Sequence, residues 1–440
     1  MKKIKIIVAL IPFLVGGNAI WAQEAEPTPV ERLEMRADNM ENAVRLLQKF
    51  KVSGYIQTQF QYAEPDADGI NFKLANRANS WEQSERKDYG RFGIRRGRLK
   101  LLYEDGIATG VVQIDVTDKG IASDRNVVTF KDVYLQVKDP AFGTNSLKAG
   151  VFDRPFGHEI SWSSSRRESP ERSRIMQSLF PDERDLGVML TLQPAKSSAL
   201  NVIKLEAGLF VGNGIRPQMV SRMDFIAHLS GELTLGNNSQ IGGGLSAYLG
   251  GVFRNDSSVF VMSNGRFVPD ANSSNRIGSY SPRRYFGVDL RYGIITAAGL
   301  TQLRCEYIGG LHPGNASGAY DFKFNSLPAP ANIYMRHLSG AYVTVAQDLG
   351  SLPLTAVVKY DFYDPNANVK GDGVGAEGSA TGRGDITMYN LGGGIFWRIN
   401  PALRLTAYCD FTRNETSANL SGYEADRSDN VFTLRLQYKF

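Results

Sequence analysis

The chain has 440 residues, a formal net charge of +5 and a mean hydropathy of −0.25. It holds 45 glycines, 19 tyrosines and 23 phenylalanines, but only two cysteines. A disulfide scaffold is therefore excluded. A basic nucleic-acid-binding protein is excluded as well, because three of the positive charges are lysines within the first five residues.

The first 22 residues predict export. Lys2, Lys3 and Lys5 precede a short apolar run at 6–15, and small residues follow before Ala22. This order of charge, apolar core and cleavage site is typical of a secretory signal peptide, and the run is too short to span a membrane. We therefore expect cleavage near Ala22 and export of residues 23–440.

Residues 23–50 predict a helical segment in the periplasm. Its apolar residues recur at spacings of three and four, with charges between them: Val30, Leu33, Ala37, Met40, Val44 and Leu47. This spacing is typical of an amphipathic helix. Two interpretations stay open, a short coiled coil between subunits or a lone surface helix, and the short length favours the second.

From residue 51 onward, apolar and polar residues alternate with a period of two. The pattern is visible at 97–103, 286–292, 354–363, 403–412 and 431–440. In the last segment the apolar set is Phe432, Leu434, Leu436, Tyr438 and Phe440, which alternates with Val431, Thr433, Arg435, Gln437 and Lys439. Alternating segments of about ten residues are the sequence signature of a transmembrane β-barrel.

Strand number and loop length support the same fold. We count sixteen candidate strands, at 51–62, 90–104, 108–118, 128–139, 146–153, 185–193, 201–210, 221–235, 240–254, 283–293, 300–310, 334–348, 354–363, 387–399, 402–413 and 428–440. Tight connections alternate with long polar ones at 63–89, 154–184, 255–282, 311–333 and 364–386. We expect an all-β fold at 51–440, a closed antiparallel transmembrane barrel surrounded by outer-membrane lipid.

Known chemical motifs are missing from the sequence. The four histidines, at 158, 228, 312 and 337, form no HExxH pair, and there is no G-x-S-x-G or Walker motif. Cys305 and Cys409 fall on apolar faces of strands four apart, so we expect no disulfide. We expect neither an enzyme nor a cofactor or metal site.

The most informative connection runs from Arg154 to Arg184. It carries six bases, Arg154, Arg166, Arg167, Arg172, Arg174 and Arg184, and five acids, Glu159, Glu168, Glu171, Asp182 and Glu183. If the loop folds into the lumen, its guanidinium groups would face the solute and favour anions. If they pair with acids of the same loop, they are structural. Both interpretations stay open.

The predicted lumen wall is also more basic than acidic. Its bases are Arg96, Arg98, Lys100, Lys148, Lys204, Arg291, Arg304, Lys359, Arg404, Arg435 and Lys439. Its acids are Asp115, Asp132, Glu206, Asp289, Glu306, Asp361 and Asp410. A modest anion preference follows. Our candidates for pore-lining, anion-guiding residues are Arg96, Arg98, Lys100, Lys148, Arg154, Arg166, Arg167, Arg172, Arg174, Arg291, Arg304, Arg404 and Arg435.

Three segments resemble a known family. The runs RRGRLKLLYEDG (95–106), FKDVYLQVKDP (130–140) and LKAGVFDRPFGHEISWSSSRRESPERS (147–173) are similar to the phosphate-selective porin O and P family. The resemblance implies a homotrimeric porin of sixteen strands whose third loop enters the pore, with arginines and lysines guiding anions. The terminal Phe440 resembles the signal that barrel insertion machinery reads. No phosphate-binding lysine of the family maps onto this chain.

These patterns together predict a function in transport. We expect an outer-membrane porin, a passive channel for small hydrophilic solutes, anionic or polar, with a preference for anions of the phosphate type or organic anions. The alternative is a barrel without transport function, an adhesin or structural protein, whose lumen is closed by loops.

Overall fold

The computed structural model describes residues 28–67, 88–117, 128–181, 183–215, 222–254, 258–271, 277–315 and 332–440. The predicted signal peptide and Asp182 lie outside these ranges, as do most of the predicted loops 63–89 and 311–333. The chain divides into two compact units, Met1–Lys49 and Phe50–Phe440.

The first unit contains one helix, α1 (Pro29–Gln48), in the described residues. Glu41 and Arg45 are one turn apart and form an ion pair of 3.2 Å. The apolar stripe is exposed along its length, from Val30 at 64% to Leu47 at 69%. No described helix combines the length and the apolar character needed to cross a membrane. The predicted helix is confirmed, whereas its pairing with other subunits stays a prediction.

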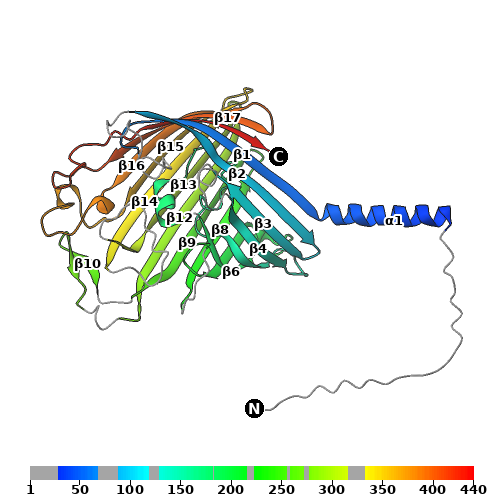
Figure 1. Cartoon of the computed structure of the whole chain (residues 1–440), viewed down its shortest axis with the longest axis horizontal. Helices are drawn as coiled ribbons and strands as arrows, with labels where there is room; N and C mark the ends of the chain where they lie inside the picture. Colours follow the sequence, from blue (N-terminus) through cyan, green and yellow to red (C-terminus); the bar gives the residue numbers. More distant parts are fainter. Residues whose placement is uncertain are drawn as a thin grey trace, which may run out of the picture. The chain divides into compact units, whose positions relative to one another are not determined.

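The second unit is a closed barrel (Figure 1). Within the described residues its wall has sixteen strands, each antiparallel to the next, and β1 pairs with both β2 and β18. The predicted fold is confirmed. The wall strands are β1 (Phe50–Ala63), β2 (Tyr89–Asp105), β3 (Ala108–Val116), β4 (Val128–Lys138), β5 (Ser146–Asp153), β6 (Arg184–Leu192), β7 (Ile203–Phe210), β8 (Asp224–Leu235), β9 (Ser239–Phe253), β12 (Tyr280–Thr296), β13 (Gly299–Gly314), β14 (Ile333–Asp348), β15 (Leu354–Asp364), β16 (Met388–Arg398), β17 (Leu403–Asn414) and β18 (Val431–Lys439).

Two further strands, β10 (Val259–Ser263) and β11 (Arg266–Pro269), form a hairpin in the loop after β9. β10 also pairs in parallel with the start of β14. Short helical turns lie in other connections: η2 (Ala199–Val202), η4 (Gly371–Gly373), η5 (Arg383–Asp385) and the six-residue helix α4 (Arg174–Leu179).

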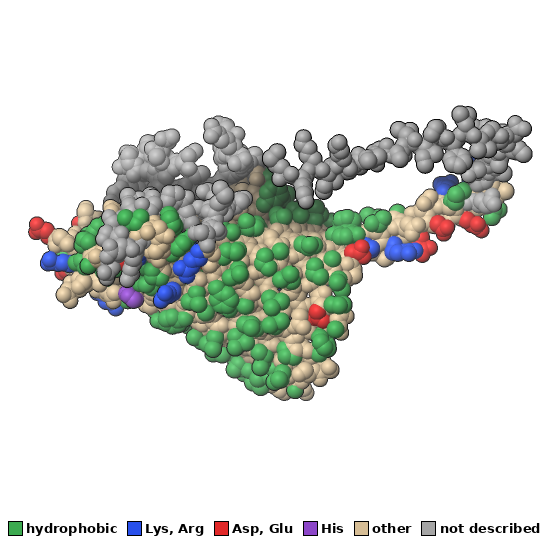
Figure 2. All heavy atoms as spheres, turned by 90° about the horizontal axis from the view of Figure 1, so that it is seen from below, with side chains coloured by type: hydrophobic (Ala, Val, Ile, Leu, Met, Phe, Trp, Pro, Cys, Tyr) green, Lys and Arg blue, Asp and Glu red, His purple; other side chains and the backbone are tan. Residues whose placement is uncertain are grey.

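Alternation along each strand separates an apolar outside from a polar inside. In β18, Phe432, Leu434 and Leu436 are exposed, whereas Thr433 and Arg435 are buried. Figure 2 shows hydrophobic side chains spread over the outer wall of the barrel, and charged side chains at its loop-bearing end and along α1. Such a surface is stable in lipid but would aggregate in water.

Connection lengths alternate as predicted. The turns after β2 and β12 have two residues each, and Gly106 adopts the left-handed conformation (φ 57°) that a tight turn requires. Long connections lie at the opposite end. One of them, residues 415–430 between β17 and β18, was not among the predicted long connections. Arg184, predicted to end the loop 154–184, is the first residue of β6.

Both cysteines are free and partly buried, Cys305 on β13 and Cys409 on β17. Three strands separate β13 from β17 in the sheet.

Candidate functional site

The connection between β5 and β6, residues 154–183 and here called the inner loop, lies inside the barrel. Its apolar side chains Phe156, Ile160, Ile175, Met176, Leu179 and Phe180 are buried in one cluster with inward-facing residues of the wall. Nine consecutive wall strands each contribute one residue to this cluster: Phe152, Met189, Phe210, Ile226, Tyr248, Tyr285, Ile308, Leu338 and Tyr363. Burying this apolar surface holds the loop within the lumen.

Glycines on the inner wall leave room for the loop. A Cβ atom at Gly287 would lie 2.9 Å from Cε1 of Phe156, and one at Gly340 would lie 2.6 Å from Cδ1 of Ile175. Larger residues at these positions would displace the loop.

The polar side of the inner loop is fastened to the wall by three carboxylates. Lys359 Nζ of β15 lies 2.8 Å from Glu159 Oε1, and Arg304 Nη2 of β13 lies 2.6 Å from Glu168 Oε2. Glu171 is approached by three guanidinium groups, at 2.7 Å from Arg95 Nε, 3.0 Å from Arg96 Nη2 and 3.2 Å from Arg435 Nη2.

Uncharged groups extend this fastening toward the closing strands. Tyr55 Oη on β1 and Ser164 Oγ are 2.6 Å apart, and Gln437 Nε2 on β18 donates to the Ser165 carbonyl at 3.1 Å. The inner loop therefore contacts β1, β2, β17 and β18 through polar groups, β5–β9, β12 and β14 through apolar ones, and β13 and β15 through both.

Charge pairing keeps the loop carboxylates ionised. Burial alone would raise the pKa of Glu171, yet the surrounding Arg95, Arg96 and Arg435 hold it well below its ordinary value. The pKa of Glu159 is also lowered, because the Lys359 ammonium outweighs the effect of burial. Glu159 and Glu171 are thus held to the wall as carboxylates at neutral pH.

Most arginines of the inner loop are buried. Arg154 pairs with Asp185 of β6 (3.1 Å), Arg172 pairs with Glu183, and Arg167 donates to the carbonyls of Ser169 and Pro170. Arg174 is buried too, and its backbone N–H donates to Asp361 (2.9 Å). Ion pairing with acids of the same loop, one of the two interpretations of these arginines, therefore holds for Arg172 but not for Arg154, whose partner is on β6.

Arg166 is the exception in the described part of the loop. It is exposed, and its guanidinium lies 4.9 Å from the centre of the Trp162 ring. Arg304 lies over the same ring at 4.8 Å. The indole therefore contacts two guanidinium groups.

The remaining wall candidates fall into two groups. Arg98 pairs with Asp115 (3.1 Å), and Arg291 lies 3.4 Å from Glu232. Lys100 and Lys148 are partly exposed on β2 and β5, and neither is ion-paired within the described part of the chain. Lys148 Nζ instead lies 4.9 Å from the Tyr134 ring and 5.2 Å from the Phe152 ring. These wall bases thus divide into those paired with acids of other wall strands and those without an ion pair in the described residues.

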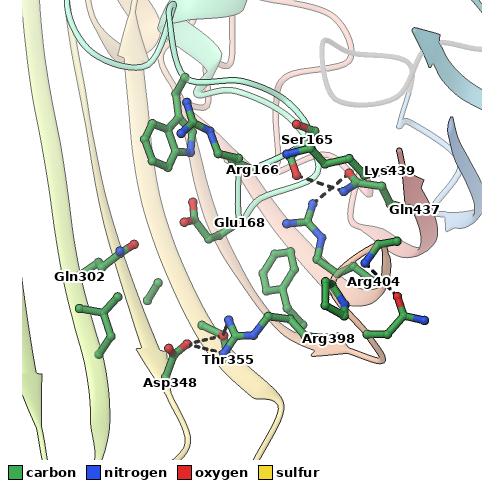
Figure 3. Close-up of a pocket in the computed structure, with 17 residues that line it drawn as sticks. Ser165, Arg166, Glu168, Gln302, Asp348, Thr355, Arg398, Arg404, Gln437 and Lys439 are labelled. Carbon is green, nitrogen blue, oxygen red and sulfur yellow. Dashed lines mark hydrogen bonds and ion pairs between the residues drawn. The ribbon is translucent and has the colours of Figure 1, made fainter. Parts of the chain in front are cut away.

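A cavity of about 640 Å³ lies between residues 162–168 of the inner loop and the turn-side ends of β13–β18 (Figure 3). Its basic lining residues are Arg166, Arg398, Arg404 and Lys439, and its acidic ones are Glu168 and Asp348. No cluster of three or more metal-binding side chains occurs among the described residues.

The sequence predicted neither Arg95 as a site residue nor Glu159, Glu168 and Glu171 as anchors of wall bases. The acids are visible in the sequence, but only the fold shows that their partners lie up to 264 residues away.

No family model matches the chain, and no curated protein matches it in sequence. Solved structures share its fold. OprB of Pseudomonas putida is 10% identical, with 92% of this chain and 97% of that one covered and a TM-score of 0.55. The outer membrane channel DcaP of Acinetobacter baumannii (12% identity, TM-score 0.52) and Salmonella typhi OmpF in complex with daunomycin (10% identity, TM-score 0.52) each cover 89% of this chain and 97% of their own. The fold is that of outer-membrane porins.

Proposed function

We propose that the protein is an outer-membrane porin, a passive channel for small hydrophilic solutes that favours anions. The observation that carries the proposal is the inner loop, which crosses a sixteen-stranded barrel and leaves basic groups partly exposed in the lumen. The resemblance of 95–106, 130–140 and 147–173 to the phosphate-selective porin family supports the same function. Export through the signal peptide, outer-membrane location and homotrimeric assembly belong to this proposal.

Anion preference depends on the bases that no carboxylate neutralises. Arg96, Arg304 and Arg435 are held by loop acids, so their charges are largely compensated. Lys100, Lys148 and Arg166 remain partly or fully exposed and have no ion-pair partner in the described residues. Uncompensated charge along a pore attracts counter-ions and raises their local concentration.

Planar-bilayer recording in a KCl gradient tests this proposal. The wild-type protein should give open-channel steps with an anion-weighted reversal potential. The triple variant Lys100→Gln, Lys148→Gln and Arg166→Gln should shift that potential toward cations. Lys196→Gln, an exposed lysine in the turn after β6, is the matched control and should change nothing. An unchanged potential in the triple variant would contradict the assignment of these three bases.

One observation favours the second function, a barrel without transport. The inner loop contacts strands around the circumference, through Glu159, Glu168 and Glu171 on its polar side and through its apolar cluster on the other. A lumen closed by these contacts would carry no current. Absence of conductance from correctly folded, heat-modifiable protein would therefore support the adhesin or structural alternative.

A further inference from the structure

The cavity beneath the inner loop combines aromatic rings with positive charge. Trp162 lines it from the loop and Phe396 from β16, and Arg404 of β17 lies 5.0 Å from the centre of the Phe396 ring. Leu300, Ala346 and Pro401 add apolar surface. A volume of about 640 Å³ is within the range typical of small-molecule sites.

Charge in the cavity is not balanced. Asp348 is paired with Arg398 (3.1 Å), and Glu168 is paired with Arg304 (2.6 Å). Both acids of the lining are thus neutralised, while Arg166 and Lys439 have no ion-pair partner in the described residues. Figure 3 shows Arg404 and Lys439 on one side of the cavity and Arg166 with Glu168 on the other.

Arg404 is held in position by neutral partners. It donates from Nη2 to the Arg167 carbonyl and to Gln437 Oε1, both at 3.3 Å, so it is oriented without losing its positive charge. A fixed guanidinium beside an aromatic ring can receive a carboxylate while the ring packs against an apolar body.

We propose that this cavity binds organic anions that carry an aromatic ring, with a carboxylate as the anionic group. The ring would pack against the apolar lining of Leu300 and Pro401 beside Trp162. The carboxylate would meet Arg404, which the Phe396 ring supports, or Arg166. This inference rests on the proposed function only in that the solute enters through the lumen. The inference adds a solute class that the charge of the wall alone would not select. Inorganic anions interact with the basic groups but have no apolar body to pack against the aromatic lining.

Benzoate and acetate are suitable probes because they share a carboxylate and differ by a ring. Binding is followed by tryptophan fluorescence in the detergent-solubilised, full mature protein, in a background with Trp81→Phe and Trp397→Phe so that Trp162 is the reporter. Benzoate should bind about tenfold more tightly than acetate, and benzylamine, with the same ring and the opposite charge, should bind no better than acetate. In bilayers, benzoate should reduce the open-channel current at concentrations where acetate does not.

Two variants retain Trp162 as the reporter. Arg404→Gln and Phe396→Leu should each weaken benzoate binding about fivefold. Arg413→Gln, an exposed arginine at the loop end of the same strand β17, is the matched control and should bind as the wild type does. Because Phe396 is buried and its replacement could impair folding, Arg404→Gln provides the independent result.

Equal affinity for benzoate and acetate, or no change in Arg404→Gln, would overturn the inference. Failure of this inference and failure of the proposed function give different experimental results. A protein that conducts with anion preference but does not distinguish the two probes remains a porin without this site. A protein that gives no current is not the proposed channel, and the fluorescence titration still decides whether the cavity binds aromatic anions.

Discussion

Glu171 of the inner loop and Arg435 of the last strand form an ion pair (Oε1–Nη2 3.2 Å), although 264 positions separate them in the sequence. Arg95 and Arg96 of β2 bind the same carboxylate. One side chain therefore connects the loop to both sides of the seam where β18 closes the barrel against β1. The fold brings together charges that the sequence keeps far apart.

Glu171→Gln should loosen this connection. The variant leaves three guanidinium groups without their anion, and breaking a buried ion pair costs about 3–5 kcal/mol. We expect the loop to release from β2 and β18, with a lower unfolding temperature and larger, noisier conductance steps. Glu377→Gln, an exposed carboxylate in the loop after β15, is the control. Wild-type conductance in Glu171→Gln would show that the apolar cluster alone holds the loop.

Gly287→Ala should displace the inner loop by steric contact. The added Cβ would lie 2.9 Å from the Phe156 ring, and such overpacking costs about 1–3 kcal/mol. We expect faster proteolysis of the loop and an altered conductance. Phe156→Leu, combined with Gly287→Ala, removes the colliding ring atoms and should restore part of the protease resistance and of the wild-type conductance. If the double variant is no better than Gly287→Ala, the damage lies in the strand and not in its contact with the loop.

The barrel itself was predictable from the sequence. Period-two alternation such as Phe432, Leu434 and Leu436 against Thr433 and Arg435 assigns an outside and an inside to each strand. Turn and loop lengths then give the strand order, because each antiparallel strand pairs with the next. The connection at 415–430 was not predicted as a long loop, because its polar residues do not differ in kind from those of a short connection between two strands.

The inner loop was only partly predictable. Its arginines suggested a role in the lumen, but the sequence could not show that Arg154, Arg167 and Arg172 are buried or that Arg166 is exposed. The ion pairs between loop and wall depend on which strand lies opposite each loop residue. Closure of the barrel determines this arrangement, and the local sequence pattern does not. Lys359 could therefore not be assigned to Glu159, 200 positions away.

The ion pair between Arg336 and Asp385 should stabilise the loop after β15. Both are fully buried at 0% exposure, with Arg336 Nε 2.8 Å from Asp385 Oδ1. Asn366 Nδ2 donates to the same oxygen at 2.7 Å. Arg336→Met would leave a buried carboxylate without its cation, at a cost of about 3–5 kcal/mol. We expect protease cleavage within 365–387, which the wild type resists.

The double variant Arg336→Met with Asp385→Asn separates the charge from the packing. It removes both charges and should recover much of the protection, because replacing a buried pair is less costly than breaking it. Equal sensitivity of the single and double variants would mean that the contact of Arg336 with the Phe267 ring, at 5.0 Å, is the larger contribution.

His158 should make stability depend on pH. Burial lowers its pKa from 6.5 to about 4, and Arg291 and Arg304 add to this, against the opposing effect of Asp289 and Glu159. The folded protein therefore binds fewer protons than the unfolded chain between about pH 4 and 6.5. The stability conferred by neutral His158 is complete above pH 6.5 and is lost as the pH falls toward 4.

Protonation of His158 should lower the free energy of unfolding by ~3 kcal/mol as the pH falls from 6.5 to 4. The loop carboxylates Glu159 and Glu171, with lowered pKa values, contribute their own loss only below their ordinary value of 4.5. His158→Gln removes the histidine slope and keeps a neutral, polar side chain. Urea unfolding in detergent at several pH values should give curves for the wild type and the variant that diverge between pH 4 and 6.5. Parallel curves would show that His158 is protonated in the folded protein, held by Asp289 and Glu159 against its burial.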